Sequence, residues 1–171
     1  STIGILFAAG GAAAFLAAPA DRWWWLGGAL GIQLRLLANM MDGMVAVEGG
    51  HKNATGPLFN EVPDRVEDAL LLVAAGYAAG VAELGYGATL LAFATAYLRA
   101  TGGALGFAQD FVGPMAKQHR MFVLTLAAVL SALLPGRPVM EAALWIIAVG
   151  AALTCAVRIA RIARLLKGRA G

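Results

Sequence analysis

Long apolar stretches follow one another along almost the whole chain, separated only by short polar breaks. Of the 171 residues, 60% are hydrophobic and 13% are charged, whereas a soluble domain has about 25% charged residues. So few charges cannot cover a water-facing surface. Because one membrane crossing needs about 20 apolar residues, the sequence predicts an all-α, polytopic membrane protein, a bundle of about six transmembrane helices forming one domain over residues 1–171.

The polar breaks and turn residues place these helices. The first apolar run begins almost at Ser1, so we expect residues upstream of this sequence to be missing from it. The fourth helix follows a predicted turn at 83–85 and ends near Gly106. The other predicted helices span residues 3–18, 23–47, 57–82, 115–134 and 139–166, and the longer polar connections are 48–56 and 109–120.

The basic residues are unevenly divided between the two ends of these helices. One side has only Arg22 and Arg137. The polar connections, the adjoining helix ends and the C-terminus hold the other eleven: Arg35, Lys52, Arg65, Arg99, Lys117, Arg120, Arg158, Arg161, Arg164, Lys167 and Arg169. Positive charge stays on the cytoplasmic side, so both termini are predicted to be cytoplasmic. The small basic excess does not indicate a nucleic-acid partner.

Polar side chains recur at helical spacing within two of the helices. A charge at the centre of a membrane helix costs about 2.5–3.5 kcal/mol, so such residues need partners or water. Residues at these spacings share one helix face. The second and third helices each have one such face, formed by Arg35, Asn39 and Asp42, and by Asn60, Asp64 and Asp68.

Two interpretations of these faces stay open on periodicity alone. Asp42 and Asp64, with the amide oxygens beside them, offer the hard ligands that Mg²⁺ or Mn²⁺ accepts. Alternatively, Arg35 and Arg65 neutralise the acids as ordinary ion pairs.

The spacing between these residues is more specific. From Asn39 to Asp64 the chain reads Asn-x-x-Asp-Gly-x-x-Ala-Val, eight residues, then Gly-x-x-x-Asn-x-x-x-Asp. This segment resembles the signature of the CDP-alcohol phosphotransferases, which is Asp-x-x-Asp-Gly-x-x-Ala-Arg, eight residues, then Gly-x-x-x-Asp-x-x-x-Asp. The number of residues between the signature positions is the same throughout. Asn39, Asn60 and Val47 depart from that signature. The two asparagines, with Glu61 after the second, resemble a bacterial branch of the family.

The resemblance implies that a phosphatidyl or other substituted phosphate group is transferred from a CDP-linked lipid donor to a small alcohol, releasing CMP, in phospholipid biosynthesis. It implies one or two Mg²⁺ or Mn²⁺ ions, a homodimer and Asp64 as catalytic base. The remaining roles follow by position. Metal ligands are Asn39, Asp42, Asn60 and Asp64, with Glu61 as a replacement carboxylate, and CDP contacts are Asp42, Gly43, Ala46 and Gly56.

Basic residues near the fourth and fifth helices have two interpretations. Arg99, Lys117 and Arg120 either bind the phosphate of an acceptor or are inner-face charges in contact with lipid headgroups. Basic residues recur from Arg158 and Arg161 to the end of the chain. We interpret them as side chains that extend toward water where the last helix leaves the membrane. Two other functions stay open: a non-catalytic relative that binds a nucleotide-lipid or scaffolds lipid enzymes, and a small transporter.

Overall fold

The computed structural model of the chain describes residues 2–48, 56–108 and 111–169, and the side chains of residues 3–41, 61–108 and 111–169. These ranges contain six helices and no strand, which confirms the predicted all-α class. The helices are α1 (Thr2–Ala17), α2 (Trp24–Glu48), α3 (Gly56–Ala78), α4 (Ala82–Ala104), α5 (Lys117–Leu133) and α6 (Val139–Arg169).

The turn between α3 and α4 lies earlier than the sequence predicts. The third helix ends at Ala78 and the fourth begins at Ala82, before the predicted turn at 83–85. Gly80 has a φ of 75°, a left-handed conformation that glycine adopts without a steric penalty. The N–H of Val81 donates to the carbonyl of Gly76 at 2.9 Å, which ends α3 with a glycine cap. The apolar pattern continues through this turn, so the sequence pattern does not reveal its position.

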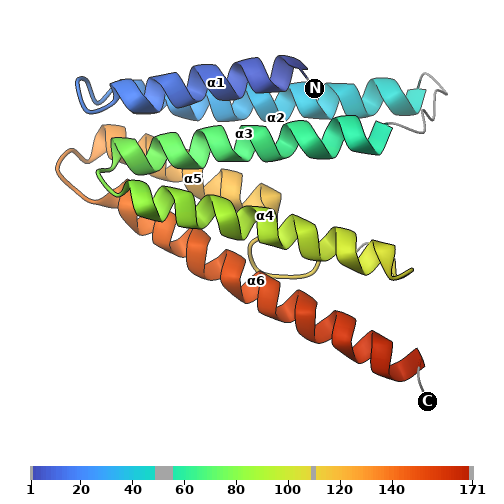
Figure 1. Cartoon of the computed structure of the whole chain (residues 1–171). Helices are drawn as coiled ribbons and strands as arrows, with labels where there is room; N and C mark the ends of the chain where they lie inside the picture. Colours follow the sequence, from blue (N-terminus) through green and yellow to red (C-terminus); the bar gives the residue numbers. More distant parts are fainter. Residues whose placement is uncertain (1, 49–55, 109–110, 170–171) are drawn as a thin grey trace.

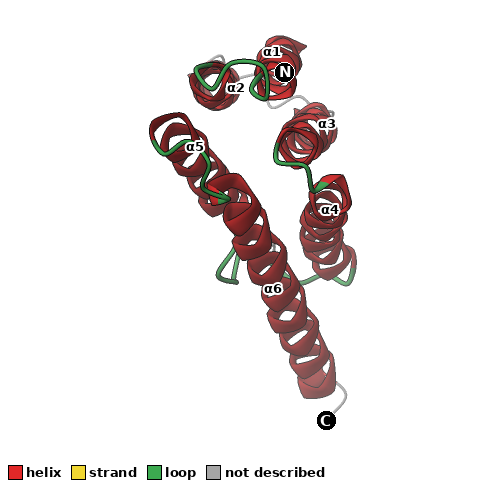
Figure 2. Ribbon diagram, turned by 90° about the vertical axis from the view of Figure 1, so that its left-hand side faces the viewer, coloured by secondary structure: helices red, strands yellow, loops and turns green. Residues whose placement is uncertain are grey.

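The helices form an antiparallel bundle with two distinct ends. The α1–α2, α3–α4 and α5–α6 turns lie together at one end, and both termini lie toward the other (Figure 1). α1 packs against α2 and α3, and α4 packs against α3 and α6. α5 packs against α2 and α6, so that α3 and α4 face α5 and α6 across the bundle (Figure 2).

Glycines allow two helix pairs to approach closely. A Cβ on Gly31 of α2 would lie 2.5 Å from the Cα of Gly11 in α1. A Cβ on Gly76 of α3 would lie 2.8 Å from the Cα of Gly85 in α4. Real Cβ atoms do not approach backbone so closely, so these contacts require glycine, as small residues do at helix interfaces in lipid. The first pair holds α1 close to α2, and the second holds α3 close to α4.

Large apolar side chains point outward along the bundle. Leu90 is 71% exposed, and Leu6 and Phe122 are similarly exposed. By length and composition, α6 alone among the described helices passes as a membrane span, and Ile3–Ala17 is apolar but shorter. The charges that lower the hydropathy of α2 and α3 include buried ones such as Arg35 and Asp68. The charges therefore do not all face the surroundings, and the six-span topology stays a prediction.

Candidate active site

A buried group of four charges connects α2, α3 and α5. Arg35 is fully buried; its Nε donates to Oε2 of Glu67 at 2.5 Å, and its Nη2 lies 2.8 Å from Oδ1 of Asp68. Arg120 completes the group through a 3.0 Å bond from Nη2 to Oδ2 of Asp68. Two arginines thus neutralise two carboxylates. The ion-pair interpretation of the sequence is correct for Arg35, and we call these four residues the buried charge group.

Asp64 lies at the edge of this group and collects donors from three helices. Its side chain is 16% exposed. Oδ1 accepts a 3.0 Å hydrogen bond from Nδ2 of Asn39, forms an ion pair with Lys117, and lies 3.5 Å from Nη2 of Arg35. Oδ2 has a single ion-pair contact among the described side chains, with Nη2 of Arg65 at 3.7 Å. The two oxygens of Asp64 therefore differ, and Oδ2 is the less occupied one.

Two of the four predicted metal ligands, Asn39 and Asp64, are in direct contact. The amide of Asn39 turns its nitrogen toward Asp64 and toward Glu67, and its Oδ1 is buried without a hydrogen-bond partner. In this orientation the amide nitrogen faces Asp64, so a divalent cation shared by the two residues would need the amide turned over to bring its Oδ1 toward the carboxylate. The described residues do not include a cluster of three acidic, histidine or cysteine side chains able to hold a metal on their own. The described donors are therefore only part of a ligand set.

The remaining predicted ligands of the metal and the nucleotide lie in the less described part of the chain. The side chains of residues 42–60 are outside the described part of the structure. This range contains the predicted metal ligands Asp42 and Asn60 and the predicted CDP-contacting residues Gly43, Ala46 and Gly56. Their roles stay predictions.

Glu61, the predicted replacement carboxylate, lies against arginines. Its Oε1 pairs with Nη2 of Arg99 on α4, and its Oε2 lies 3.8 Å from Nη2 of Arg65. Its side chain is 45% exposed. The carboxylates that contact Asn39 are instead those of Asp64 and Glu67. A role of Glu61 as a metal ligand stays a prediction.

A cavity opens beside Asp64, and a second, larger cavity adjoins it. The smaller, of about 140 Å³, is lined by Asp64 and by all three predicted anion-binding residues, Arg99, Lys117 and Arg120. Of these three, Arg120 is buried and bonded to Asp68. The larger cavity, of about 410 Å³, lies between α4 and α6 and shares Arg99 and Arg158 with the smaller one.

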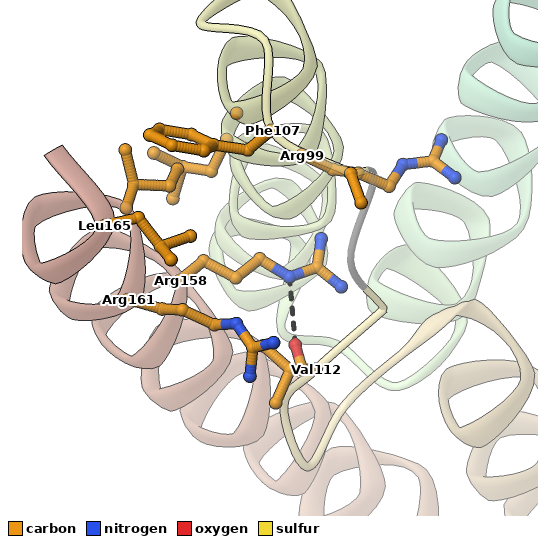
Figure 3. Close-up of a pocket in the computed structure, with 10 residues that line it drawn as sticks. Arg99, Phe107, Val112, Arg158, Arg161 and Leu165 are labelled. Carbon is orange, nitrogen blue, oxygen red and sulfur yellow. Dashed lines mark hydrogen bonds between the residues drawn. The ribbon is translucent and has the colours of Figure 1, made fainter. Parts of the chain in front are cut away.

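The larger cavity has a cationic side and an apolar side. Arg99, Arg158 and Arg161 line one part of it, and Phe107 and Leu165 line another (Figure 3). Such a lining suits a molecule that has both an anionic and an apolar part.

Arg158 is buried, unlike a side chain that extends to the surface where the last helix leaves the membrane. Arg158 is 6% exposed, and its guanidinium donates to the carbonyls of Val112, at 3.0 Å, and Thr95. Arg161, three residues later, is exposed, and it lines the larger cavity together with Arg158. The available signal was the three-residue spacing, which keeps both arginines near one face of α6.

Solved structures share this fold. No protein-family model matches the sequence, and no curated protein matches it. The phosphatidylinositol phosphate synthase of Mycobacterium tuberculosis with CDP-DAG bound superposes with a TM-score of 0.76 at 20% identity, covering 94% of this chain and 84% of that chain. Its complex with manganese and citrate gives 0.76 at 20% identity, with 94% and 80% covered. At this identity the likeness establishes the fold.

Proposed function

We propose that the chain is a CDP-alcohol phosphotransferase that transfers a phosphatidyl group from CDP-diacylglycerol to a small alcohol and releases CMP, in phospholipid biosynthesis. The observation that carries the proposal is the position of Asp64. The last aspartate of the sequence signature lies in the wall of a cavity beside Asn39, Lys117 and Arg99. The fold shared with a synthase that binds CDP-DAG supports the same assignment.

In this reaction Asp64 is the base. Oδ1 is held by Asn39 and Lys117, which orient the carboxylate, while Oδ2, whose one described contact is with Arg65 at 3.7 Å, accepts the proton of the acceptor hydroxyl. The acceptor oxygen forms a bond to the phosphorus that bears the diacylglycerol. The bond from that phosphorus to the bridging oxygen breaks, and CMP leaves with the bridging oxygen and its electron pair.

The basic residues around Asp64 match anionic substrates. The described side chains that line the cavity, apart from Arg120 of the buried charge group, include two carboxylates and four cations: Glu61, Asp64, Arg65, Arg99, Lys117 and Arg158. The buried charge group beside them is balanced. The excess of positive charge favours the diphosphate of the donor and an acceptor that itself bears a phosphate.

One or two Mg²⁺ or Mn²⁺ ions belong to the proposal. Asn39, Asp42, Asn60 and Asp64, with Glu61 as a replacement carboxylate, would hold them. When bound, such ions neutralise diphosphate charge and polarise the phosphorus. The manganese in the complex of the related synthase supports this choice of metal.

The membrane setting is also proposed. Outward-facing apolar side chains and the apolar α6 favour a multi-pass protein of the bacterial inner membrane. The positive-inside bias supports a cytoplasmic location for the Asp64 cavity and both termini. The homodimer rests on the family resemblance.

Release of CMP tests the proposal. Purified protein in nanodiscs is supplied with CDP-diacylglycerol, Mn²⁺ and a panel of alcohols with and without a phosphate group. The proposal expects CMP and a new phospholipid in equal amounts, dependent on both the alcohol and the metal, with a phosphate-bearing alcohol preferred. The absence of CMP with every alcohol tested would overturn it.

The ion pair between Lys117 and Asp64 favours a second candidate, a non-catalytic relative that binds a nucleotide-lipid. An ammonium on the carboxylate, together with asparagine at positions 39 and 60, is compatible with binding without turnover. This candidate expects CDP binding that is unchanged in Asp64→Asn and no CMP release. It also expects that the double variant Asn39→Asp, Asn60→Asp gains activity.

A further inference from the structure

A third cavity lies at the opposite end of the bundle from both termini. It has a volume of about 290 Å³ and is enclosed by the α1–α2 turn, the end of α3 and the α5–α6 turn. These three segments meet at the same end in Figure 1. Arg22 and Arg137 both line it. They are the two basic residues that the positive-inside count leaves on the outer side, and the fold brings them to one place.

Both arginines are exposed residues in the lining of this cavity. Among the described residues, no ion pair joins either arginine to an acid, and the ring of Trp23 lies 4.9 Å from the Cζ of Arg22. Glu141 is the acid in the lining. Two guanidiniums and one carboxylate leave one positive charge, which one phosphodiester would balance.

The buried wall of the cavity has a polar atom that calls for a ligand. Ser131 is 8% exposed and lines the cavity, and its Oγ has no hydrogen-bond partner. A buried hydroxyl without a partner is unfavourable, and rotation about the Cα–Cβ bond of Ser131 would let it donate to a ligand oxygen in the cavity. Pro19, Pro135 and Pro138 stiffen the rim, so the cavity needs little ordering when a ligand binds.

We propose that this cavity binds a phosphate group through Arg22 and Arg137, with Ser131 bonding a further oxygen of the same ligand. The phosphate belongs either to a lipid headgroup of the outer leaflet or to a free anion. Arginine forks match phosphate oxygens in pairs. The site lies far from Asp64 along the bundle. The proposal of phosphate binding there does not depend on whether the chain is a transferase.

Native mass spectrometry of the full chain tests the proposal. The protein is released from nanodiscs that contain phosphatidylglycerol or, as the phosphate-free comparison, diacylglycerol, and the bound lipids are counted. The variants are Arg22→Gln, Arg137→Gln and Ser131→Ala. Arg164→Gln is the matched control, because Arg164 is an exposed arginine on α6 that does not line this cavity.

We expect phosphatidylglycerol to bind and diacylglycerol not to bind. Each glutamine variant should weaken binding about tenfold, as the loss of one charge-assisted hydrogen bond predicts, and Ser131→Ala should weaken it less. Arg164→Gln should bind like the unaltered chain. If inorganic phosphate displaces phosphatidylglycerol, the ligand is a free anion. If inorganic phosphate does not displace it, the ligand is the lipid headgroup. Equal binding by all variants, or equal loss in Arg164→Gln, overturns the proposal.

Discussion

Arg35 is the side chain whose loss most disturbs the balance of buried charge. It is fully buried and neutralises Glu67 and Asp68 at 2.5 and 2.8 Å. In Arg35→Met, two carboxylates face only Arg120 in the buried charge group. Removal of one partner from a buried ion pair costs about 3–5 kcal/mol, since it leaves an uncompensated charge. At about 2–4 °C per kcal/mol for a chain of this size, the melting temperature should fall by about 6–20 °C.

The double variant Arg35→Met, Glu67→Gln shows whether charge causes this loss. It removes one cation and one anion, so the group is neutral again, and we expect the melting temperature to recover part of the fall. Unfolding is followed by tryptophan fluorescence in one detergent, with Arg164→Met as the exposed control. Because substitutions at exposed sites change stability by about 0.5 kcal/mol or less, the control should stay near the unaltered chain. A single variant that melts with the control, or a double variant that melts below the single, would refute the reasoning.

Three further predictions follow from contacts of single residues. Gly31→Ala places a Cβ 2.5 Å from backbone of α1 and should lower stability by about 1–3 kcal/mol, whereas Gly10→Ala, with open space around it, should not; thermal unfolding compares them. Lys117→Met removes the ammonium that competes for the neighbouring carboxylate and should tighten Mn²⁺ binding, measured by electron paramagnetic resonance; weaker binding would contradict the ion pair. Arg158→Met should destabilise the chain more than Arg161→Met in the same unfolding assay, because the guanidinium of Arg158 donates to two main-chain carbonyls.

Much of the fold and the centre of the site could be predicted from local patterns. Apolar runs and turn residues predict helices, since the pattern and the structure have the same period. The four-residue spacing of Arg35 and Asn39, and of Asp64 and Asp68, predicts one polar face on each helix. The structure brings the two faces together, with Asn39 bonded to Asp64. Glu67 lies three residues after Asp64, on the same side of α3, and its side chain is fully buried.

The burial of Arg120 and Arg158 could not be predicted in the same way. A basic residue near the end of a membrane helix has the same local sequence whether it faces lipid headgroups or the interior. The packing of α5 and α6 against the other helices determines the outcome, and this packing depends on contacts between residues far apart in the chain. The meeting of Arg22 with Arg137 at one cavity has the same origin.

The rate of CMP release by Asp64→Asn tests the central claim most directly. The account predicts that CMP release from CDP-diacylglycerol falls about 10²–10⁴-fold, the usual contribution of a general base, while CDP affinity stays within a small factor. Glu83→Gln, an exposed acid in the first turn of α4 at the far end of the bundle, should keep the original rate. An Asp64→Asn variant that releases CMP as fast as Glu83→Gln would contradict the role of Asp64 as the base.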